Sequence, residues 1–312
     1  MRIGPVVDSK GSSVHRERVV HGSVYISTGA FRTLSISEII RQSLEAGLYH
    51  VELSSGTDWE PDMLDLVHQT AGSPIHYLVH NYFPPHEDPF VLNLASADPG
   101  NLERSLDHCR RAVDLSADLK GAFFSVHSGF AFTARPEHLG KDQTALPRVS
   151  LEQAQEIFVQ SLKTLCAYAS ERGVTILIEN NVIAPFNLIN GKNRLGLCAT
   201  AEELLQTHAG VGASNLGFLI DVGHAKVTAT ALRFDAQAFL DKVAPYVRAF
   251  HLSDNDGTAD TNQCFDESAW FIPRLADFPE TTMILESYRL EIGEIRRVRR
   301  VIEDARSRKK SV

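Results

Sequence analysis

The sequence predicts one α/β domain in which eight parallel strands close into a (β/α)8, or TIM, barrel. Short apolar runs of strand character alternate along the chain with longer segments of helical periodicity. Eight such runs are present, and eight is the number of parallel strands that closes this barrel. No linker or shift of composition divides the 312 residues, so residues 1–312 are expected to form a single domain.

The predicted strands follow one another at regular intervals. They start at Ser23 (SVYISTGA), Tyr49 (YHVELSS), Pro74 (PIHYLVHNY), Gly121 (GAFFSVHSG), Val174 (VTILIENN), Leu216 (LGFLIDVGH), Val247 (VRAFHLSD) and Thr282 (TMILESY). Amphipathic segments lie between them. One of these begins with a capping box formed by Ser35 and Glu38. Another begins at Ser150 as its N-cap and ends at Gly173 as its C-cap.

The two ends of the chain are expected to lie outside this alternation. Residues 1–21 precede the first strand and form an N-terminal extension. Residues 291–310 form a terminal amphipathic helix with a solvated basic face. Its apolar residues at helical spacing are Ile295, Val298, Val301 and Ile302.

The composition limits the class of protein. Hydrophobic residues make up 43% of the chain and charged residues 22%, as in a globular protein with a large core. A formal net charge of −8 disfavours a nucleic-acid partner. No segment has the apolar length of a secretion signal or a membrane span, so a cytoplasmic protein without a membrane anchor is expected. The sequence leaves a homo-oligomer open.

The cysteines are few and scattered. They are Cys109, Cys166, Cys198 and Cys264, and no two of them have the short spacing of a metal site. Free thiols in a reducing compartment are therefore expected.

Two connections between predicted elements are long. One runs from Ser128 to Pro147 after the fourth strand, and the other from Val182 to Ala199 after the fifth. Both leave the C-terminal end of a strand, which is the face of such a barrel that normally carries the active site. Loops of this length are usually functional, so both are predicted to cover a substrate.

Acidic residues and histidines stand at the C-terminal ends of most predicted strands. From the second strand to the eighth they are Glu52, His80, His127, Glu179, Asp221 with His224, His251 and Glu286. The chain has 39 Asp and Glu and 13 His, so six successive strand ends would each carry one by chance only about once in two hundred chains. Because these ends converge on one face, a common site is expected there.

Four of these residues suit a divalent cation. Glu179, Asp221, His251 and Glu286 offer three carboxylates and one imidazole, a set that favours Mn, Mg, Co or Zn. Three negative charges at one barrel mouth would repel one another strongly without a cation. The sequence therefore predicts one bound divalent ion.

His80 and His127 lie on the strands next to Glu179. With Glu179 as a bridge they could hold a second ion, as in sites with two metals. The alternative is that both histidines hydrogen-bond the substrate without a metal.

Further residues near the same strand ends are candidates for substrate contacts. His224 would orient substrate or transfer a proton near neutral pH, or else face solvent at a helix start. Glu52 would hydrogen-bond a ligand hydroxyl or form a paired charge inside the barrel. Lys226 and Arg289 would contact a phosphate or carboxylate of the substrate.

In the segments ILIEN, DVGHAK, HLSDNDGT and ILES the chain resembles the xylose-isomerase-like barrel superfamily over nearly its whole length. This superfamily includes sugar phosphate isomerases and epimerases, ketose epimerases, sugar-derived dehydratases and the endonuclease IV family. The resemblance implies that the four predicted ligands hold a catalytic divalent metal. It also implies that Glu179 and Glu286 act as an acid/base pair on opposite sides of the substrate carbon.

The reaction implied by the resemblance is isomerisation or epimerisation of a sugar, a sugar phosphate or a related polyol. One glutamate would remove a proton next to a metal-bound carbonyl; an aldose–ketose isomerase would instead shift a hydride. A dehydratase or lyase would start with the same proton abstraction and expel a β-hydroxyl. The non-enzymatic alternative is a barrel that only binds sugar. Loss of one of the four predicted metal ligands would favour this alternative, and all four are present.

The endonuclease IV branch implies a different chemistry, phosphoester hydrolysis on zinc. There His80 and His127 would bind one zinc, and His224 would bind another with an Asp-x-His pair further along the chain. This chain has Asp260, but Asn262 stands where the histidine is expected. An amide is a poor zinc ligand, so the trinuclear site is disfavoured and a dinuclear phosphoesterase stays an alternative.

Overall fold

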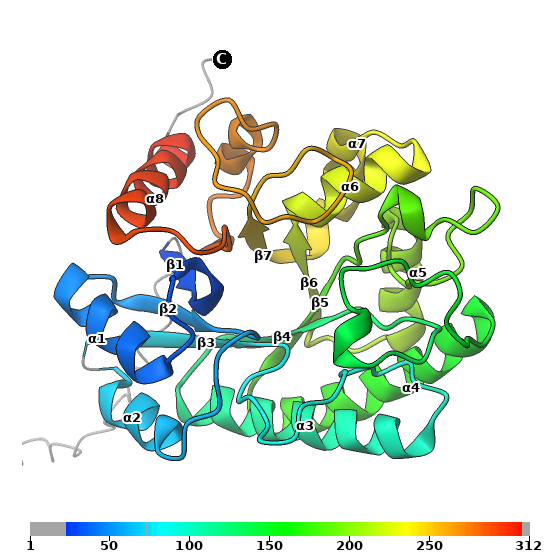
Figure 1. Ribbon diagram of the computed structural model, residues 1–312, viewed down its shortest axis with the longest axis horizontal. Helices are drawn as coiled ribbons and strands as arrows, with labels where there is room; N and C mark the ends of the chain where they lie inside the picture. The colour runs from blue at the N-terminus through cyan, green and yellow to red at the C-terminus, as the bar shows by residue number, and fades with distance from the viewer. Residues whose placement is uncertain (1–22, 73, 308–312) are drawn as a thin grey trace, which may run out of the picture.

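The computed structural model describes residues 23–72 and 74–307 (Figure 1). The predicted N-terminal extension and residues 308–310 of the predicted terminal helix lie outside them. The strands are β1 (Val24–Ser27), β2 (His50–Leu53), β3 (His76–His80), β4 (Phe123–His127), β5 (Thr175–Glu179), β6 (Leu216–Asp221), β7 (Val247–Leu252) and β8 (Thr282–Leu285). All pairings are parallel and follow chain order, and β8 pairs with β1. The predicted (β/α)8 barrel is confirmed.

The α-helices cover the outside of the barrel (Figure 1). They are α1 (Ile36–Ala46), α2 (Met63–Thr70), α3 (Pro99–Asp118), α4 (Leu151–Ser170), α5 (Ala201–Val211), α6 (Val222–Leu232), α7 (Ala236–Val243) and α8 (Ile292–Ser307). The sequence predicts one helix after each strand, and this prediction is wrong for the seventh strand. Two helices follow β6, while β7 is followed only by the 3-10 helix η5 (Ile272–Asp277). Pro279, just beyond η5, cannot continue a helix because it lacks an N–H group.

Alternation along the strands places the predicted site residues above an apolar layer inside the barrel. That layer consists of Tyr25, Leu78, Phe123, Leu177, Leu219, Ala249 and Ile284. Successive side chains of a strand point to opposite faces, so the residue two positions later also points inward. Leu177 is thus followed by Glu179, and Ala249 by His251. The outward residues pack against the helices in a larger core.

Helix ends follow the predicted caps in part. Ser35 and Ser150 are both N-caps whose side chains accept a backbone N–H. The reciprocal half of the first capping box is not formed, because the Glu38 carboxylate instead binds Arg41 in the next turn, with Oε2 2.8 Å from Nε. Helix α4 ends just before its predicted C-cap, Gly173, which ends the following turn with a φ of 69°.

The predicted terminal helix packs on the barrel as α8, with its four apolar residues buried. Within residues 23–72 and 74–307, no helix has the length and apolar character needed to span a membrane. All four cysteines are free thiols, as predicted.

The two long connections lie side by side at the C-terminal face of the barrel. Phe130 after β4 and Gly196 after β5 form an antiparallel bridge. Further out, the Gln143 N–H donates to Asn187 Oδ1 at 2.9 Å. The connections therefore form one hydrogen-bonded rim beside the strand ends that carry His127 and Glu179.

A buried histidine on α3 holds the backbone next to these strand ends. His108 Nε2 donates to the Asn81 carbonyl at 3.0 Å, and His108 Nδ1 lies 2.9 Å from His86 Nε2. Asn81 Oδ1 in turn accepts the backbone N–H of His127 at 3.4 Å. Burial lowers the pKa of His108 to about 4.

We expect His108→Gln to make stability less dependent on pH. The ordinary histidine pKa is near 6.5, so between pH 6.5 and about 4 the unfolded chain binds more protons than the folded one. Stability is therefore lost as pH falls through this window, by about 2 kcal/mol from this residue at pH 5. Urea unfolding at pH 7 and pH 5 should show a loss about 2 kcal/mol smaller in the variant. Equal losses would contradict the assignment.

Candidate active site

The acidic and histidine side chains from seven strand ends meet in the mouth of the barrel. One set consists of Glu179, Asp221, His251 and Glu286, and each offers a ligand atom within 4.8 Å of the others. A second set with the same spacing consists of His80, His127 and Glu179, and a third, deeper one of Glu52, His80 and His251. Glu179 belongs to both of the first two sets, which is the geometry expected of a bridging carboxylate.

Glu179 is the centre of the cluster and is fully buried. Its Oε1 lies 3.2 Å from His251 Nδ1, and its Oε2 lies 3.3 Å from His127 Nδ1 and 3.5 Å from His80 Nε2. Burial alone would raise the pKa of this carboxyl, but the surrounding histidines lower it well below its usual value. Glu179 is therefore held as a carboxylate.

Asp221 is positioned by the turn from β6 into α6. Its Oδ1 accepts the His224 N–H at 2.7 Å, which leaves Oδ2 buried without a hydrogen bond. The Asn180 amide bonds both backbone groups of Asp221, at 2.8 and 3.1 Å. A Cβ at Gly223 would lie 2.7 Å from Ser253 Oγ, so a side chain at this position would displace Ser253. Burial raises the pKa of Asp221 to about 8.

His251 joins carboxylates on two sides of its ring and has no exposed surface. Nδ1 lies 2.9 Å from Glu286 Oε2, and Nε2 lies 3.0 Å from Glu52 Oε2. Burial would lower the pKa of His251, but Glu286, Glu52 and Glu179 together raise it well above its usual value. Burial also raises the pKa of Glu286.

The first set fits a hard divalent cation. It provides three carboxylates and one imidazole, and Asp221 Oδ2 is buried without a hydrogen-bond partner. Such an oxygen is costly to bury unless positive charge faces it. The raised pKa of His251 shows that this environment favours positive charge. Glu179, Asp221, His251 and Glu286 are therefore suited to hold the ion.

The second set is also oriented toward its shared carboxylate. His80 Nδ1 hydrogen-bonds Ser125 Oγ at 3.0 Å, while His80 Nε2 is buried without a hydrogen bond on the side of Glu179. Burial lowers the pKa of His80 and of His127, so neutral rings are favoured. Sequence reasoning missed Ser125, although it shares the inward face of β4 with His127.

His224 is buried rather than solvent-facing. Its Nδ1 donates to the Asn180 carbonyl at 2.9 Å, and its Nε2 lies 3.2 Å from Asp260 Oδ2. Asp260 Oδ1 is buried without a partner. Asn262 Oδ1 accepts the Ser253 hydroxyl at 3.1 Å, so the amide that replaces the expected histidine is occupied by a structural contact.

Comparison with known proteins agrees with this arrangement. The sequence profile described as "Xylose isomerase-like TIM barrel" matches residues 40–304. The chain belongs to this family.

Three known proteins, one compared by sequence and two by structure, are similar to this chain. Fructoselysine 3-epimerase of Shigella flexneri is 21% identical over 250 residues, which cover 76% of this chain and 79% of the relative. Among solved structures, a D-tagatose 3-epimerase-like protein superposes with a TM-score of 0.68 at 18% identity, covering 91% of this chain and 96% of that one. D-Psicose 3-epimerase from Clostridium cellulolyticum H10, with D-tagatose, has a TM-score of 0.63 at 14% identity, with the same coverage of both chains. The structural likenesses show the shared fold.

Three other residues of this xylose isomerase-like barrel were predicted to contact substrate: Glu52, Lys226 and Arg289. Glu52 is the paired charge inside the barrel, bonded to His251. Lys226 is already paired, with Nζ 2.7 Å from Asp254 Oδ1. Arg289 is exposed on the loop after β8. The structure therefore brings Glu52 into the cluster, while Lys226 is paired with a residue outside the three ligand sets and Arg289 faces solvent.

Tyr288, which sequence reasoning missed, faces the cluster from the rim. Its side chain is 45% exposed, yet burial of the hydroxyl raises its pKa well above the usual value, helped by the charges of Glu286, Asp260 and Asp221. Tyr288 therefore lies close enough to these carboxylates for their charges to act on its hydroxyl, and one edge of its ring lies against Gly29. Its position two residues after Glu286 was the available signal.

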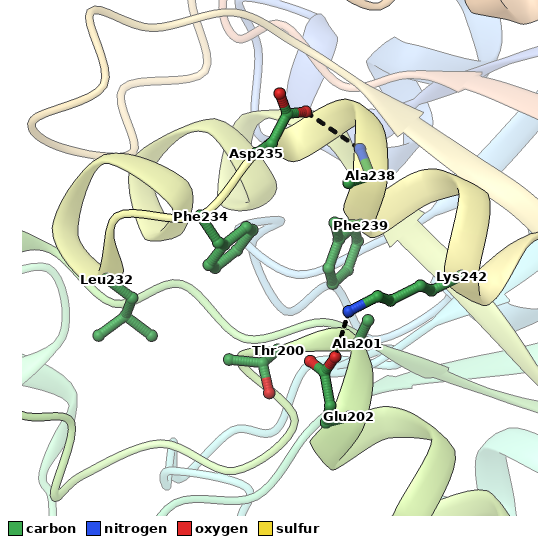
Figure 2. A pocket seen from close by; sticks show the side chains of 9 residues that line it. All are labelled: Thr200, Ala201, Glu202, Leu232, Phe234, Asp235, Ala238, Phe239 and Lys242. Carbon is green, nitrogen blue, oxygen red and sulfur yellow. Dashed lines mark hydrogen bonds and ion pairs between the residues drawn. The ribbon is translucent and has the colours of Figure 1, made fainter.

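A pocket of about 340 Å³ lies elsewhere, on the outside of the barrel between α5 and the helices α6 and α7 (Figure 2). Its walls include the aromatic rings of Phe234 and Phe239, and an ion pair between Lys242 and Glu202 borders it. None of the predicted site residues lines this pocket. The residues with predicted roles in binding or catalysis therefore lie outside this pocket, and most of them line the mouth of the barrel.

Proposed function

We propose that this chain is a divalent-cation-dependent epimerase or isomerase that acts on a sugar, a sugar phosphate or a related polyol. The observation that carries the proposal is the convergence of two buried glutamates, Glu179 and Glu286, on His251 Nδ1 at 3.2 and 2.9 Å. Two carboxylates beside one cation site are what proton removal and return require. The relative named fructoselysine 3-epimerase supports the same reaction class.

A divalent cation held by Glu179, Asp221, His251 and Glu286 would supply positive charge that makes a C–H group beside a substrate carbonyl more acidic. Burial raises the pKa of Glu286, which makes its carboxylate a stronger proton acceptor. One of Glu179 and Glu286 would then remove a proton from one face of the carbon, and the other would deliver a different proton to the opposite face, which inverts the carbon. An isomerase would instead return hydrogen to the neighbouring carbon.

Other groups at the mouth would orient the substrate. His224 is fixed by the Asn180 carbonyl at Nδ1, and a substrate hydroxyl that replaced Asp260 at Nε2 would meet the ring in one orientation. Tyr288 lies close enough to the cluster carboxylates for their charges to act on its hydroxyl. The connections after β4 and β5 form a joint rim that would limit access of water to the bound sugar.

A second candidate function is phosphoester hydrolysis on two zinc ions. The set of His80, His127 and Glu179 favours it, because neutral imidazoles and a bridging carboxylate suit zinc. A dehydratase would share the first proton abstraction with an epimerase, and its product would lack a hydroxyl.

Metal content and solvent deuterium uptake test these candidates together. We expect protein purified without chelators to carry about one Mn, Co or Mg per chain. In D2O, with ketoses, sugar phosphates, cyclitols and fructoselysine as substrates, the epimerised product should carry one deuterium at the inverted carbon. EDTA should abolish the exchange, and the same cation should restore it. About two zinc ions per chain with phosphatase activity and no exchange would favour the second candidate.

A further inference from the structure

The Glu52 carboxylate, which comes from a strand that does not pair with β7, hydrogen-bonds Nε2 of His251. Glu52 belongs to β2, which pairs with β1 and β3 and not with β7, the strand of His251. Its side chain nevertheless crosses the barrel interior, and Oε2 lies 3.0 Å from His251 Nε2. Both residues have no exposed surface, so no bulk water competes for this hydrogen bond. Glu52 pairs in register with Leu78 of the apolar layer, two residues before His80, and so lies deeper in the barrel than the residues of the mouth.

This contact determines which ring nitrogen faces the candidate cation site. A carboxylate oxygen only accepts, so the hydrogen between the two groups belongs to His251 Nε2. Nδ1 is then the nitrogen that points toward Glu179 and Glu286, at 3.2 and 2.9 Å. A cation in that position needs the lone pair of Nδ1. By the same rule Nδ1 donates to Glu179 and Glu286 as long as no cation is present, so a cation would displace the hydrogen of Nδ1 while the Glu52 contact keeps the hydrogen of Nε2 in place.

We propose that Glu52 is a positioning residue that selects the Nε2–H form of His251 and so prepares Nδ1 to bind the cation. This inference rests on the cation site of the proposed function. Without Glu52, a buried Nε2–H would have no partner. The ring would instead carry its hydrogen on Nδ1 and donate it to Glu286 or Glu179, which removes the lone pair from the site. Metal-binding histidines are generally held by such a carboxylate.

The test compares Glu52→Leu with Glu52→Gln. Leucine removes the acceptor, whereas the glutamine carbonyl still accepts the Nε2–H group. The measurement is the dissociation constant for Mn²⁺, obtained by competition with a chelating dye. We expect Glu52→Leu to weaken binding about 10- to 100-fold and Glu52→Gln to stay within about threefold of wild type. The control is Ser27→Ala, because Ser27 pairs in register with Glu52 and its buried hydroxyl has no partner.

Two results would overturn the inference while the proposed function stands. Binding by Glu52→Leu equal to wild type would show that the contact does not prepare the site. Equal weakening in Glu52→Gln and Glu52→Leu would show that the charge of Glu52 matters rather than its role as an acceptor. Wild-type protein that binds no Mn²⁺ would overturn the proposed function as well, which separates the two failures.

A measurement on the wild-type chain keeps the inference testable should the leucine variant not fold. In 15N-histidine NMR spectra of the Zn²⁺-loaded protein, His251 is expected to bind through Nδ1 and to retain its hydrogen on Nε2. The signal is assigned by its absence from the spectrum of His251→Asn. Binding through Nε2 would overturn the inference.

Discussion

Replacing Glu286 by glutamine is expected to lower turnover by roughly a thousandfold while the barrel stays folded. Glutamine has nearly the same shape, but its amide cannot accept the substrate proton. The residue is buried, with Oε2 2.9 Å from His251 Nδ1, so the change removes negative charge from the centre of the site. The measurement is kcat on the best epimerisation substrate, with thermal unfolding followed by circular dichroism as the check of folding.

Deuterium exchange in the same variant separates the two glutamates. If Glu286 acts on one face only, Glu286→Gln should lose exchange from one epimer and retain slow exchange from the other. The matched control is Glu203→Gln at the cap of α5, where Oε2 accepts the Ala199 N–H at 2.7 Å and a glutamine carbonyl can do the same. Unchanged turnover in Glu286→Gln would remove this residue from the mechanism.

The convergence of the site could be predicted because it depends on strand periodicity. An apolar inward residue such as Leu177 or Ala249 is followed two positions later by Glu179 or His251, on the same face of the sheet. In a parallel barrel these positions end at the same rim. Pattern alone was therefore sufficient to name the residues of both candidate ligand sets.

The hydrogen-bond and ion-pair partners of these residues could not be predicted, because they depend on which side chains from distant strands come into contact in the folded barrel. Glu52 reaches His251 across the barrel, whereas its sequence position also suited a ligand hydroxyl. Lys226 pairs with Asp254, a contact that the spacing of the two residues does not indicate. Two possible partners compete for Glu38 within its own helix, and the sequence does not show which one it binds. Its carboxylate binds Arg41 instead of completing a capping box.

The sequence and the structure identify the candidate site residues more closely than they identify the reaction. Proton abstraction beside a carbonyl begins epimerisation, isomerisation and dehydration alike, and one set of carboxylates serves all three. What distinguishes them is where the substrate lies relative to Glu179, Glu286 and the rim groups. Tyr288 illustrates this, because the charges of the carboxylates act on its hydroxyl, but its position two residues after Glu286 does not specify which substrate group it would contact.

Replacing Glu179 by glutamine is expected to have the largest effect on cation binding. Glu179 belongs to both ligand sets, and its two oxygens face His251 on one side and His80 and His127 on the other. An amide offers a single neutral oxygen, so Mn²⁺ affinity should fall by roughly a hundredfold or more, and turnover with it. Elemental analysis and dye competition measure the loss.

His80→Ala separates the two sets, because it removes one ligand of the second and none of the first. If the four-ligand set is independent, this variant retains one ion per chain, whereas Glu179→Gln retains none. The matched control is His76→Ala on the same strand, whose exposed ring belongs to neither set. Loss of all metal in His80→Ala would show that the two sets form one cluster, since the first would then depend on a residue outside it.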